Sequence, residues 1–150
     1  MPQSCTSLFH HIIFSTKNRL PQISDDLATQ LYPYVGGIIR DCDSSLIAIG
    51  GMPDHLHLLV NISKEKSVAE ILRIVKANSS RWIHQTFPEQ STFAWQSGYG
   101  AFTVSPLNVT SIKRYILTQR EHHRTMMFQE EFQQFLEHYR IPYNGRYLWE

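Results

Sequence analysis

Two histidines placed two residues apart are the side chains of this sequence best suited to chemistry. His55 and His57 open an apolar run that continues to Val60. In a β-strand, residues i and i+2 point to the same face, so the two imidazoles would project together, roughly 6 to 7 Å apart. Leu56, Leu58 and Val60 would then anchor the strand in a core. Two imidazoles fixed in this way are half of a metal site.

The histidine pair alone does not establish a metal site, because a His-x-His is more often incidental. Its place on an apolar strand favours a metal, since a buried imidazole needs a hydrogen-bond or metal partner and here two need one at the same spot. A zinc finger is a poor match, because no Cys-x-x-Cys accompanies the pair. A histidine-triad nucleotide hydrolase would need a third histidine where the chain has Leu59.

Length and composition are those of a globular protein. With 150 residues, 42% hydrophobic and 18% charged, we expect one domain, 1–150, with its own core. The sequence shows neither an apolar run of the ~20 residues that span a membrane nor the pattern of a signal peptide. Cys5 and Cys42, the two cysteines, fit a reducing compartment, so we expect a cytoplasmic protein. The net charge of +1 means that nucleic-acid binding must rest on local basic clusters.

Several segments are rich in the β-branched and aromatic residues typical of strands. Strands are predicted over 7–16, 44–50 and 52–62, with one or two short strands within 92–105. The short connection Gly50-Gly51 predicts that the second and third strands form a hairpin. On the first strand His10 and His11 would face opposite ways, as one surface and one core histidine.

Four other segments have the apolar periodicity of amphipathic helices. These helices are predicted from Ser24 to about 39, from 67 to about 86, from 108 or 110 to about 124, and from 128 to 139. Ser24 is a suitable N-cap of the first helix, in which Pro33 predicts a kink or a late start. Ser67 and Glu70 form a capping box at the start of the second.

The helix predicted over 109–124 carries the second group of candidate functional residues. Its face is formed by residues at i, i+3, i+4 and i+7, namely Ile112, Tyr115, Ile116 and Gln119. Tyr115 on that face is readily explained as a core tyrosine. Gln119 is not, because a buried amide must bond or ligate something. Its carbonyl oxygen, one turn from the phenol of Tyr115, would complete a two-histidine metal site.

Basic residues gather in three places. The candidate DNA-binding residues are Lys17 and Arg19 in the turn after the first strand, Lys76 and Arg81 on the helix over 67–86, and Arg120 in the positive cluster around Tyr115. Such charges ordinarily form a solvated face, but Arg and Lys also suit phosphate. The residues alone leave both interpretations open.

These segments together resemble a known family. Met52–Leu59 looks like the His-hydrophobic-His (HUH) motif, and Tyr115–Arg124 looks like the tyrosine helix of single-tyrosine HUH transposases, which serve the smallest bacterial insertion sequences, of the IS-two-hundred type. The segments Phe14–Arg19, Trp95–Phe102 and Arg146–Trp149 are also similar, so the resemblance covers nearly the whole chain in order. Two-tyrosine relaxases share the histidine pair, but Gln119 stands where their second tyrosine would be. Transposases associated with repeated extragenic palindromes share the same motifs.

We therefore expect an α+β domain, an antiparallel sheet with helices packed on one face, similar to the ferredoxin-like or RNA-recognition-motif-like core of HUH enzymes. The resemblance implies a transposase that cleaves and rejoins single-stranded DNA with hairpins at the element ends, through a 5′-phosphotyrosine on Tyr115. It also implies a homodimer in which the tyrosine helix of one subunit can lie against the histidine pair of the other.

The chemistry is intelligible from the residues themselves. A divalent ion held by His55, His57 and Gln119 would bind the oxygens of the scissile phosphate and neutralise developing charge. Mg²⁺ or Mn²⁺ suits phosphate, and imidazole ligands favour Mn²⁺. Tyr115, with an ordinary pKa near ~10, would attack phosphorus once nearby cations favour its phenolate.

Two other classes of function remain open. The first is a non-mobile protein that binds or processes DNA hairpins, related to palindrome-associated tyrosine transposases, or a nucleic-acid-binding module that uses the same sheet without chemistry. The set His55, His57, Tyr115 and Gln119 argues against it, since a non-catalytic protein has no physical reason to keep all four. The second is a zinc hydrolase with free water as the nucleophile, which would leave no protein–DNA adduct.

Overall fold

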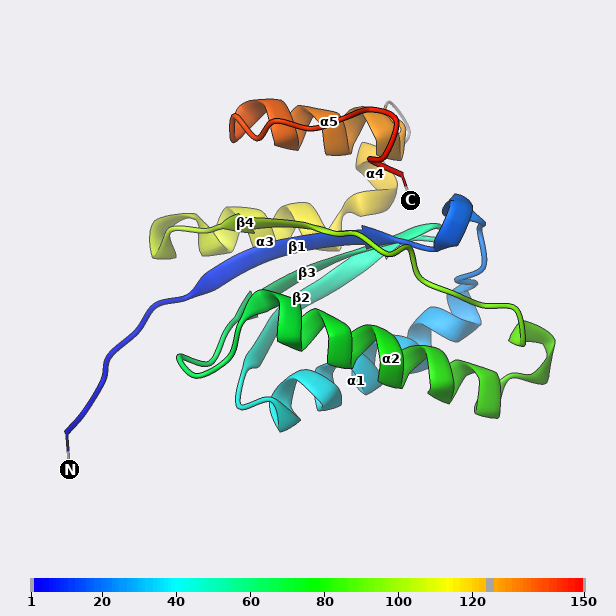
Figure 1. Ribbon diagram of the computed structural model, residues 1–150, viewed down its shortest axis with the longest axis horizontal. Helices are drawn as coiled ribbons and strands as arrows, with labels where there is room; N and C mark the ends of the chain where they lie inside the picture. The colour runs from blue at the N-terminus through cyan, green and yellow to red at the C-terminus, as the bar shows by residue number, and fades with distance from the viewer. Residues whose placement is uncertain (1, 124–125, 150) are drawn as a thin grey trace.

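A four-stranded sheet forms the centre of the molecule. The computed structural model describes residues 2–123 and 126–149. The strands are β1 (Phe9–Ser15), β2 (Ser45–Met52), β3 (His55–Asn61) and β4 (Gly100–Thr103), and they lie in the order β2-β3-β1-β4 (Figure 1). Each neighbouring pair is antiparallel, so the antiparallel sheet expected from the sequence is confirmed.

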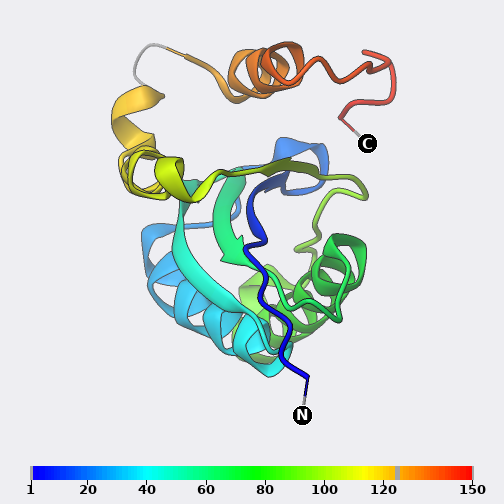
Figure 2. The same cartoon turned by 90° about the vertical axis from the view of Figure 1, so that its left-hand side faces the viewer.

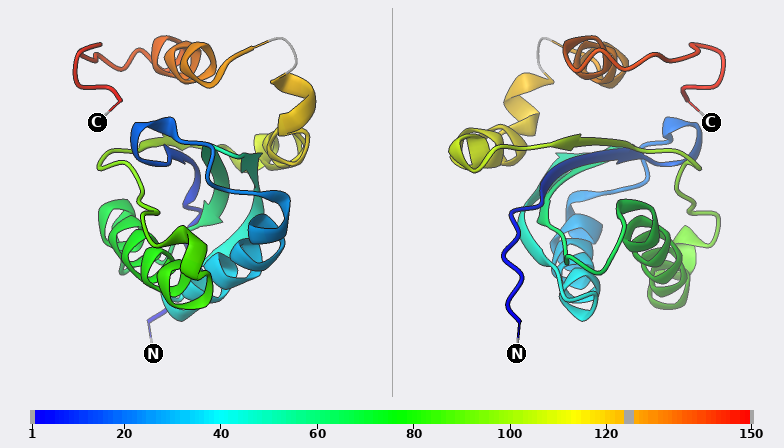
Figure 3. Two further views of the ribbon diagram at one scale, coloured as in Figure 1. Left: turned by 90° about the vertical axis from the view of Figure 1, so that its right-hand side faces the viewer. Right: turned by 60° about the vertical axis from the view of Figure 1, so that its left-hand side comes forward.

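Two long helices cover one face of this sheet, and the helices that follow the last strand lie on the opposite side (Figure 2). The helices are α1 (Asp25–Asp41), α2 (Val68–Thr86), α3 (Val109–Leu117), α4 (Gln119–His122) and α5 (Phe128–His138), with short 3-10 turns η1 (Lys17–Arg19), η2 (Pro88–Gln90) and η3 (Pro106–Asn108). The order β1-α1-β2-β3-α2-β4 is the split βαβ arrangement of ferredoxin-like domains. The predicted α+β fold is confirmed, and α5 adds a layer on the side away from α1 and α2 (Figure 3).

The face under α1 and α2 carries the main hydrophobic core. Ile12 and Phe14 of β1 pair with Leu58 and Leu56 of β3, and all four side chains are fully buried against the two helices. Because side chains alternate along a strand, the residues between them point to the opposite face. That opposite face is the one that α5 covers.

The hairpin between β2 and β3 is confirmed, but the prediction that Gly50 and Gly51 connect the two strands is wrong. Both glycines lie inside β2, and the turn is formed by Pro53 and Asp54. A Cβ on Gly50 would overlap the carbonyl oxygen of Ile116 in α3. Glycine is required in the strand because a helix backbone approaches it there.

Two helices differ from their predicted course. α1 begins directly after its Ser24 cap and runs on through the exposed Pro33, so the late start that was one of the two predicted alternatives does not occur. The helix predicted over 109–124, whose end lies outside the described residues, is interrupted at Thr118. The Thr118 hydroxyl donates to the Arg114 carbonyl at 2.8 Å, a bond that commonly bends helices. Within the described residues, no helix has the length and hydropathy needed to cross a membrane.

Candidate active site

β3 places His55 and His57 together on the face that α5 covers, as the alternation predicted. Their antiparallel partners on β1 are Ser15 and Ile13. Both imidazoles are fully buried, since the C-terminal helices close over them. Phe128 of α5 stacks on the His55 ring, with 4.3 Å between the ring centroids. The histidine pair is therefore a rigid, dehydrated feature of the fold.

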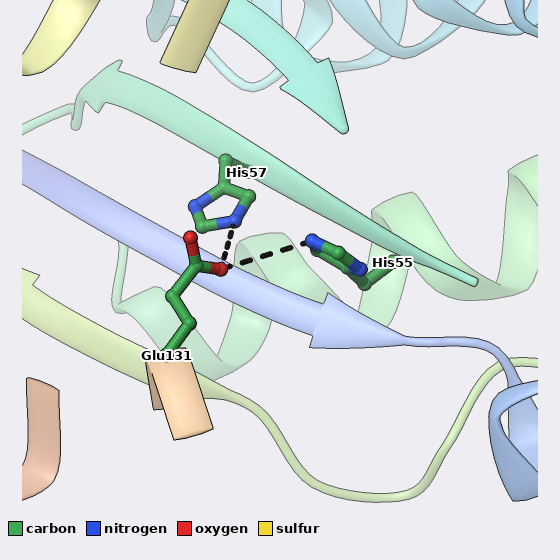
Figure 4. Close-up of side chains that lie close together, drawn as sticks. All are labelled: His55, His57 and Glu131. Carbon is green, nitrogen blue, oxygen red and sulfur yellow. Dashed lines mark hydrogen bonds and ion pairs between the residues drawn. The ribbon is translucent and has the colours of Figure 1, made fainter. Parts of the chain in front are cut away.

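A carboxylate from α5 meets both histidines. Glu131 Oε1 lies 2.9 Å from His57 Nε2 and 3.8 Å from His55 Nε2 (Figure 4). The sequence interpretation missed Glu131, although a signal was present: Glu131 falls three residues after Phe128 and four before Phe135, on the apolar side of its helix. A carboxylate there needs a partner for the same reason as the amide of Gln119.

Tyr115 and Gln119 reach the same place from α3 and α4. The Tyr115 hydroxyl donates a hydrogen bond to Glu131 Oε2. Gln119 is 2% exposed, its Oε1 lies 3.4 Å from His55 Nε2, and its Nε2 donates to the Tyr115 carbonyl at 3.3 Å. One chain thus brings together all four side chains proposed from the sequence, His55, His57, Tyr115 and Gln119, and adds Glu131.

The Nδ1 atoms of His55 and His57, which face away from Glu131, also have hydrogen-bond partners. His55 Nδ1 lies 2.7 Å from Asp54 Oδ1, and His57 Nδ1 lies 2.9 Å from Nε2 of the buried His11. Because the Glu131 carboxylate can only accept, the neutral His57 donates from Nε2 to Glu131 Oε1, and its Nδ1 accepts from His11 Nε2. As a metal ligand through Nε2, His57 would instead carry its proton on Nδ1 and donate it to His11. Partners of this kind fix the ring orientation of metal-binding histidines. The expectation of one core histidine on β1 is met by His11, while His10 is half-buried.

Burial sets the protonation of these groups. Lost hydration lowers the pKa of His57 to about 4, against the pull of the Glu131 carboxylate. Burial and then His57 lower the pKa of His11 to about 3. Burial alone would raise the pKa of Glu131, but the imidazoles of His123 and His57 outweigh it and bring this pKa below its usual range. Burial, followed by the bond to Glu131, raises the pKa of Tyr115. At neutral pH the rings of His57 and His11 are therefore neutral, Glu131 is a carboxylate and Tyr115 is a protonated phenol.

This donor set fits a divalent ion. One ligand atom each from His55, His57 and Glu131 lies within 4.8 Å of the others. Neutral imidazoles offer lone pairs, and the oxygens of a carboxylate and of Gln119 are hard ligands, a mixture that suits Mn²⁺ and Mg²⁺. Two histidines with a glutamate also bind zinc in hydrolases, so the ligands alone do not choose the reaction.

Two further histidines lie at the rim of the site. His123 Nε2 is 3.4 Å from Glu131 Oε1, and the His122 ring stacks on Tyr115 with centroids 4.4 Å apart. Both follow Gln119 by one turn, a spacing that could have drawn attention to them. A cavity of about 410 Å³ is walled in part by His122, Tyr115 and Glu131, so it leads to the phenol and the carboxylate.

Lys76, one of the candidate DNA-binding residues, is engaged with the chain itself. Its ammonium donates to the carbonyls of Gln96 at 3.0 Å and Gly98 at 2.8 Å, and burial lowers its pKa to about 8. The side chain thereby ties α2 to the loop before β4. A phosphate contact by Lys76 would have to replace these bonds.

The other four candidates lie in three separate places, with Lys17 and Arg19 together in η1. Arg81 bonds the Asn78 side chain at 2.6 Å, Arg120 pairs with Asp25 of α1, Arg19 lies 5.6 Å from the centre of the Trp149 ring, and Lys17 is exposed in η1. The structure does not gather them into one patch, and a role for any of them in DNA binding stays a prediction.

Known proteins are similar to this chain in sequence and in fold. A family model described as "Transposase IS200 like" matches residues 4–119. The ISDra2 transposase TnpA of Deinococcus radiodurans is 24% identical over 119 residues, which cover 76% of this chain and 85% of that protein.

Two solved structures are similar. The crystal structure of a putative transposase from Deinococcus radiodurans has a TM-score of 0.65 and 26% identity, covering 77% of this chain and 95% of that one. A REP-associated tyrosine transposase bound to a REP hairpin has a TM-score of 0.57 and 14% identity, covering 77% and 70% of the two chains. At 14% identity the second likeness shows the fold alone.

Proposed function

Because this chain belongs to the family of IS200-like transposases, we propose that it cleaves and rejoins single-stranded DNA at the ends of a mobile element through a covalent bond to Tyr115. One observation carries the proposal: the phenol of Tyr115 and the histidine pair converge on the same carboxylate, Glu131. A tyrosine that served only as core packing would have no reason to point at potential metal ligands.

His55, His57 and Gln119 are the residues that we propose to hold a divalent ion, Mg²⁺ or Mn²⁺. When bound, such an ion supplies positive charge to the phosphate oxygens and favours the phenolate of Tyr115. The chain's own residues do the positioning: buried rings fixed by Asp54 and His11 keep the ligands from rearranging as charge develops.

The proposed reaction is a reversible exchange of phosphate esters. The Tyr115 oxygen forms a bond to phosphorus, the P–O3′ bond breaks, the phenolic proton is released, and the 3′ oxygen leaves to take up a proton. The 5′ phosphate stays on the protein. A 3′-hydroxyl that attacks this phosphotyrosine rejoins the strands without ATP, since one phosphodiester is exchanged for another.

The proposed substrate is single-stranded DNA that carries a hairpin. A structurally similar transposase is named as bound to a REP hairpin, and this supports a hairpin partner here. A DNA substrate in bacteria places the work in the cytoplasm, at the nucleoid. The resemblance to dimeric family members supports a homodimer.

A zinc-dependent hydrolase is the second candidate, and the set of two histidines and Glu131 is what favours it. A binding module without chemistry is the third.

Incubation of the protein with labelled single-stranded element ends and Mn²⁺ or Mg²⁺, followed by denaturing gel electrophoresis, distinguishes the three candidate functions. We expect a cleaved strand and a protein–DNA adduct. Cleavage without adduct would indicate the hydrolase, and binding without cleavage would indicate the module.

A further inference from the structure

We propose that Glu131 is a third side-chain ligand of the divalent ion and that its second oxygen holds Tyr115 beside that ion, so that α5 completes the site. This inference rests on the proposed function, because it assigns a role at the same metal centre. It goes beyond the family resemblance, since the family model ends at residue 119 and Glu131 lies outside it.

The burial of Glu131 is the first argument. Its side chain is 2% exposed, on a helix whose neighbouring buried residues are Phe128 and Phe132. An ionised carboxylate is rarely buried unless it is paired or binds a metal. The sequence of α5 thus departs from an apolar face at one position, and that position faces the histidine pair.

The two oxygens of Glu131 have different partners. Oε1 lies 2.9 Å from His57 Nε2 and 3.8 Å from His55 Nε2, while Oε2 accepts the hydrogen bond from Tyr115. Donors that share an ion at about 2.1 Å from each are themselves roughly 3 to 4 Å apart. Oε1 is therefore placed as a ligand, and Oε2 is left to orient the phenol.

The charge of Glu131 matters as much as its position. Two imidazoles and the amide of Gln119 make a neutral ligand set, which binds Mn²⁺ or Mg²⁺ weakly. A carboxylate adds the negative charge and the hard oxygen that these ions prefer. A centre with Glu131 should hold its ion more tightly than one with Gln119 as the only oxygen donor.

α5 is docked by contacts that do not involve Glu131. Phe128 and Phe132 pack with Ile13 and Phe102 of the sheet. Gly100 of β4 leaves room for the Phe132 ring, which a Cβ there would overlap. The helix would therefore stay in place when the carboxylate is changed, and this makes a substitution at position 131 informative.

The test is to titrate the full chain with Mn²⁺ in the absence of DNA and to measure the binding affinity by isothermal titration calorimetry. The variants are Glu131→Gln, which keeps the shape and loses the charge, and Glu130→Gln, a matched control at the exposed neighbouring position. We expect Glu131→Gln to weaken Mn²⁺ binding about 10- to 100-fold, with Glu130→Gln like the unchanged protein. Thermal unfolding in chelator shows whether each variant keeps its fold.

The outcomes separate this inference from the proposed function. If His55→Ala loses Mn²⁺ while Glu131→Gln binds it normally, the metal centre stands and Glu131 is no ligand. Tighter binding by Glu131→Gln would mean that the carboxylate occupies the place of the ion, which also overturns the inference. If His55→Ala itself binds Mn²⁺ normally, the proposed metal centre fails.

The role toward Tyr115 has its own readout. At saturating Mn²⁺ we expect Glu131→Gln to form adduct more slowly than Glu130→Gln, because the phenol is less firmly held. An equal rate at saturating Mn²⁺ would remove this part of the proposal and leave metal binding as the function of Glu131.

Discussion

The Tyr115 hydroxyl donates a hydrogen bond to a carboxylate oxygen of Glu131, sixteen residues further along the chain. The other oxygen of that carboxylate lies 2.9 Å from His57 Nε2. One side chain therefore connects the candidate nucleophile on α3 to a candidate metal ligand on β3. The geometry therefore gives each member of the site a role that a single substitution can separate from the others.

Replacement of Tyr115 by phenylalanine removes one oxygen and keeps the ring that stacks on His122. We expect Tyr115→Phe to abolish adduct formation and to leave hairpin binding within about twofold, because the fold keeps its packing. Tyr143→Phe, at an exposed tyrosine, is the matched control and should react normally. Adduct formation by Tyr115→Phe at an unchanged rate would place the nucleophile elsewhere, with Tyr99, Tyr139, Tyr143 and Tyr147 next to test.

The candidate ligands should contribute unequally to metal-dependent cleavage. We expect His57→Gln to lower metal-dependent cleavage by about 100-fold, and Gln119→Ala by about tenfold, because a neutral amide is the weaker ligand. His10→Gln is a suitable control, since His10 bonds the backbone of Leu8 and lies outside the site. Single-turnover cleavage at several Mn²⁺ concentrations measures each effect. An unchanged rate and metal affinity in Gln119→Ala would make that side chain a packing residue.

The sheet and most of the helices could be predicted because their signals are local. Alternation on β3 gives the shared face of His55 and His57, and the capping residue Ser24 gives the start of α1. Gln119 could be identified because an amide is unusual on an apolar helix face, and its Oε1 lies 3.4 Å from His55 Nε2. The same argument applies to Glu131, whose partners His57 and Tyr115 are supplied by the folding of α5 back over the sheet.

The predictions from the sequence were wrong where a residue is constrained by contact with a distant part of the chain. Gly-Gly usually marks a turn, but here Gly50 lies within β2 and makes room for Ile116 of α3. No residue near Gly50 in the sequence indicates that the backbone of α3 comes this close. The break in the long helix at Thr118 had a local cause, a hydroxyl bond to Arg114, but threonine is common enough in helices that it gave no warning.

Acid should weaken the fold over a defined window. The pKa of His57 is lowered from 6.5 to about 4, mainly by burial, and that of His11 to about 3. Below pH 6.5 the unfolded chain therefore binds more protons than the folded one, and the free energy of unfolding falls as pH drops from about 6.5 toward 4. Each group contributes a slope of up to about 1.4 kcal/mol per pH unit.

Urea unfolding in chelator at pH 7, 6 and 5 measures this slope. The double variant His11→Gln, His57→Gln should have a shallower dependence over the same range, because its two buried titratable rings are gone. A flat stability between pH 6.5 and 5 in the unchanged protein would show that these imidazoles are not kept neutral by the fold.

The close packing of α3 on β2 should not tolerate an added methyl group at Gly50. A Cβ at Gly50 would overlap the Ile116 carbonyl, so we expect Gly50→Ala to cost about 1 to 3 kcal/mol and to slow adduct formation by shifting the helix that carries Tyr115. Gly36→Ala is the control: the new methyl group meets only Leu46, at 3.5 Å, and should stabilise α1 by about 0.5 to 1 kcal/mol. Equal stabilities of the two variants would contradict the proposed constraint at Gly50.

Whether two subunits share their sites is the last question that the geometry addresses. The family resemblance implies a homodimer in which the tyrosine helix of one subunit can lie against the histidine pair of the other. In the structure, however, one chain carries the whole site: Ile116 packs with Ala48 and Leu59 of its own sheet, and Tyr115 donates a hydrogen bond to Glu131 of the same chain.

A mixed dimer tests which arrangement is active. One chain carries His55→Ala and His57→Ala, and the other carries Tyr115→Phe. If each chain uses its own tyrosine, both sites in the mixed dimer lack a component, and we expect no adduct. If the helices exchange, one site regains intact histidines and an intact tyrosine, so adduct should form at up to half the rate of the unchanged dimer. Adduct in verified mixed dimers would therefore show that the packing of α3 on its own sheet is released before reaction, and that the close contact at Gly50 belongs to a resting form. Its absence, together with activity of the unchanged chain at concentrations where it is monomeric, would show that a single chain suffices.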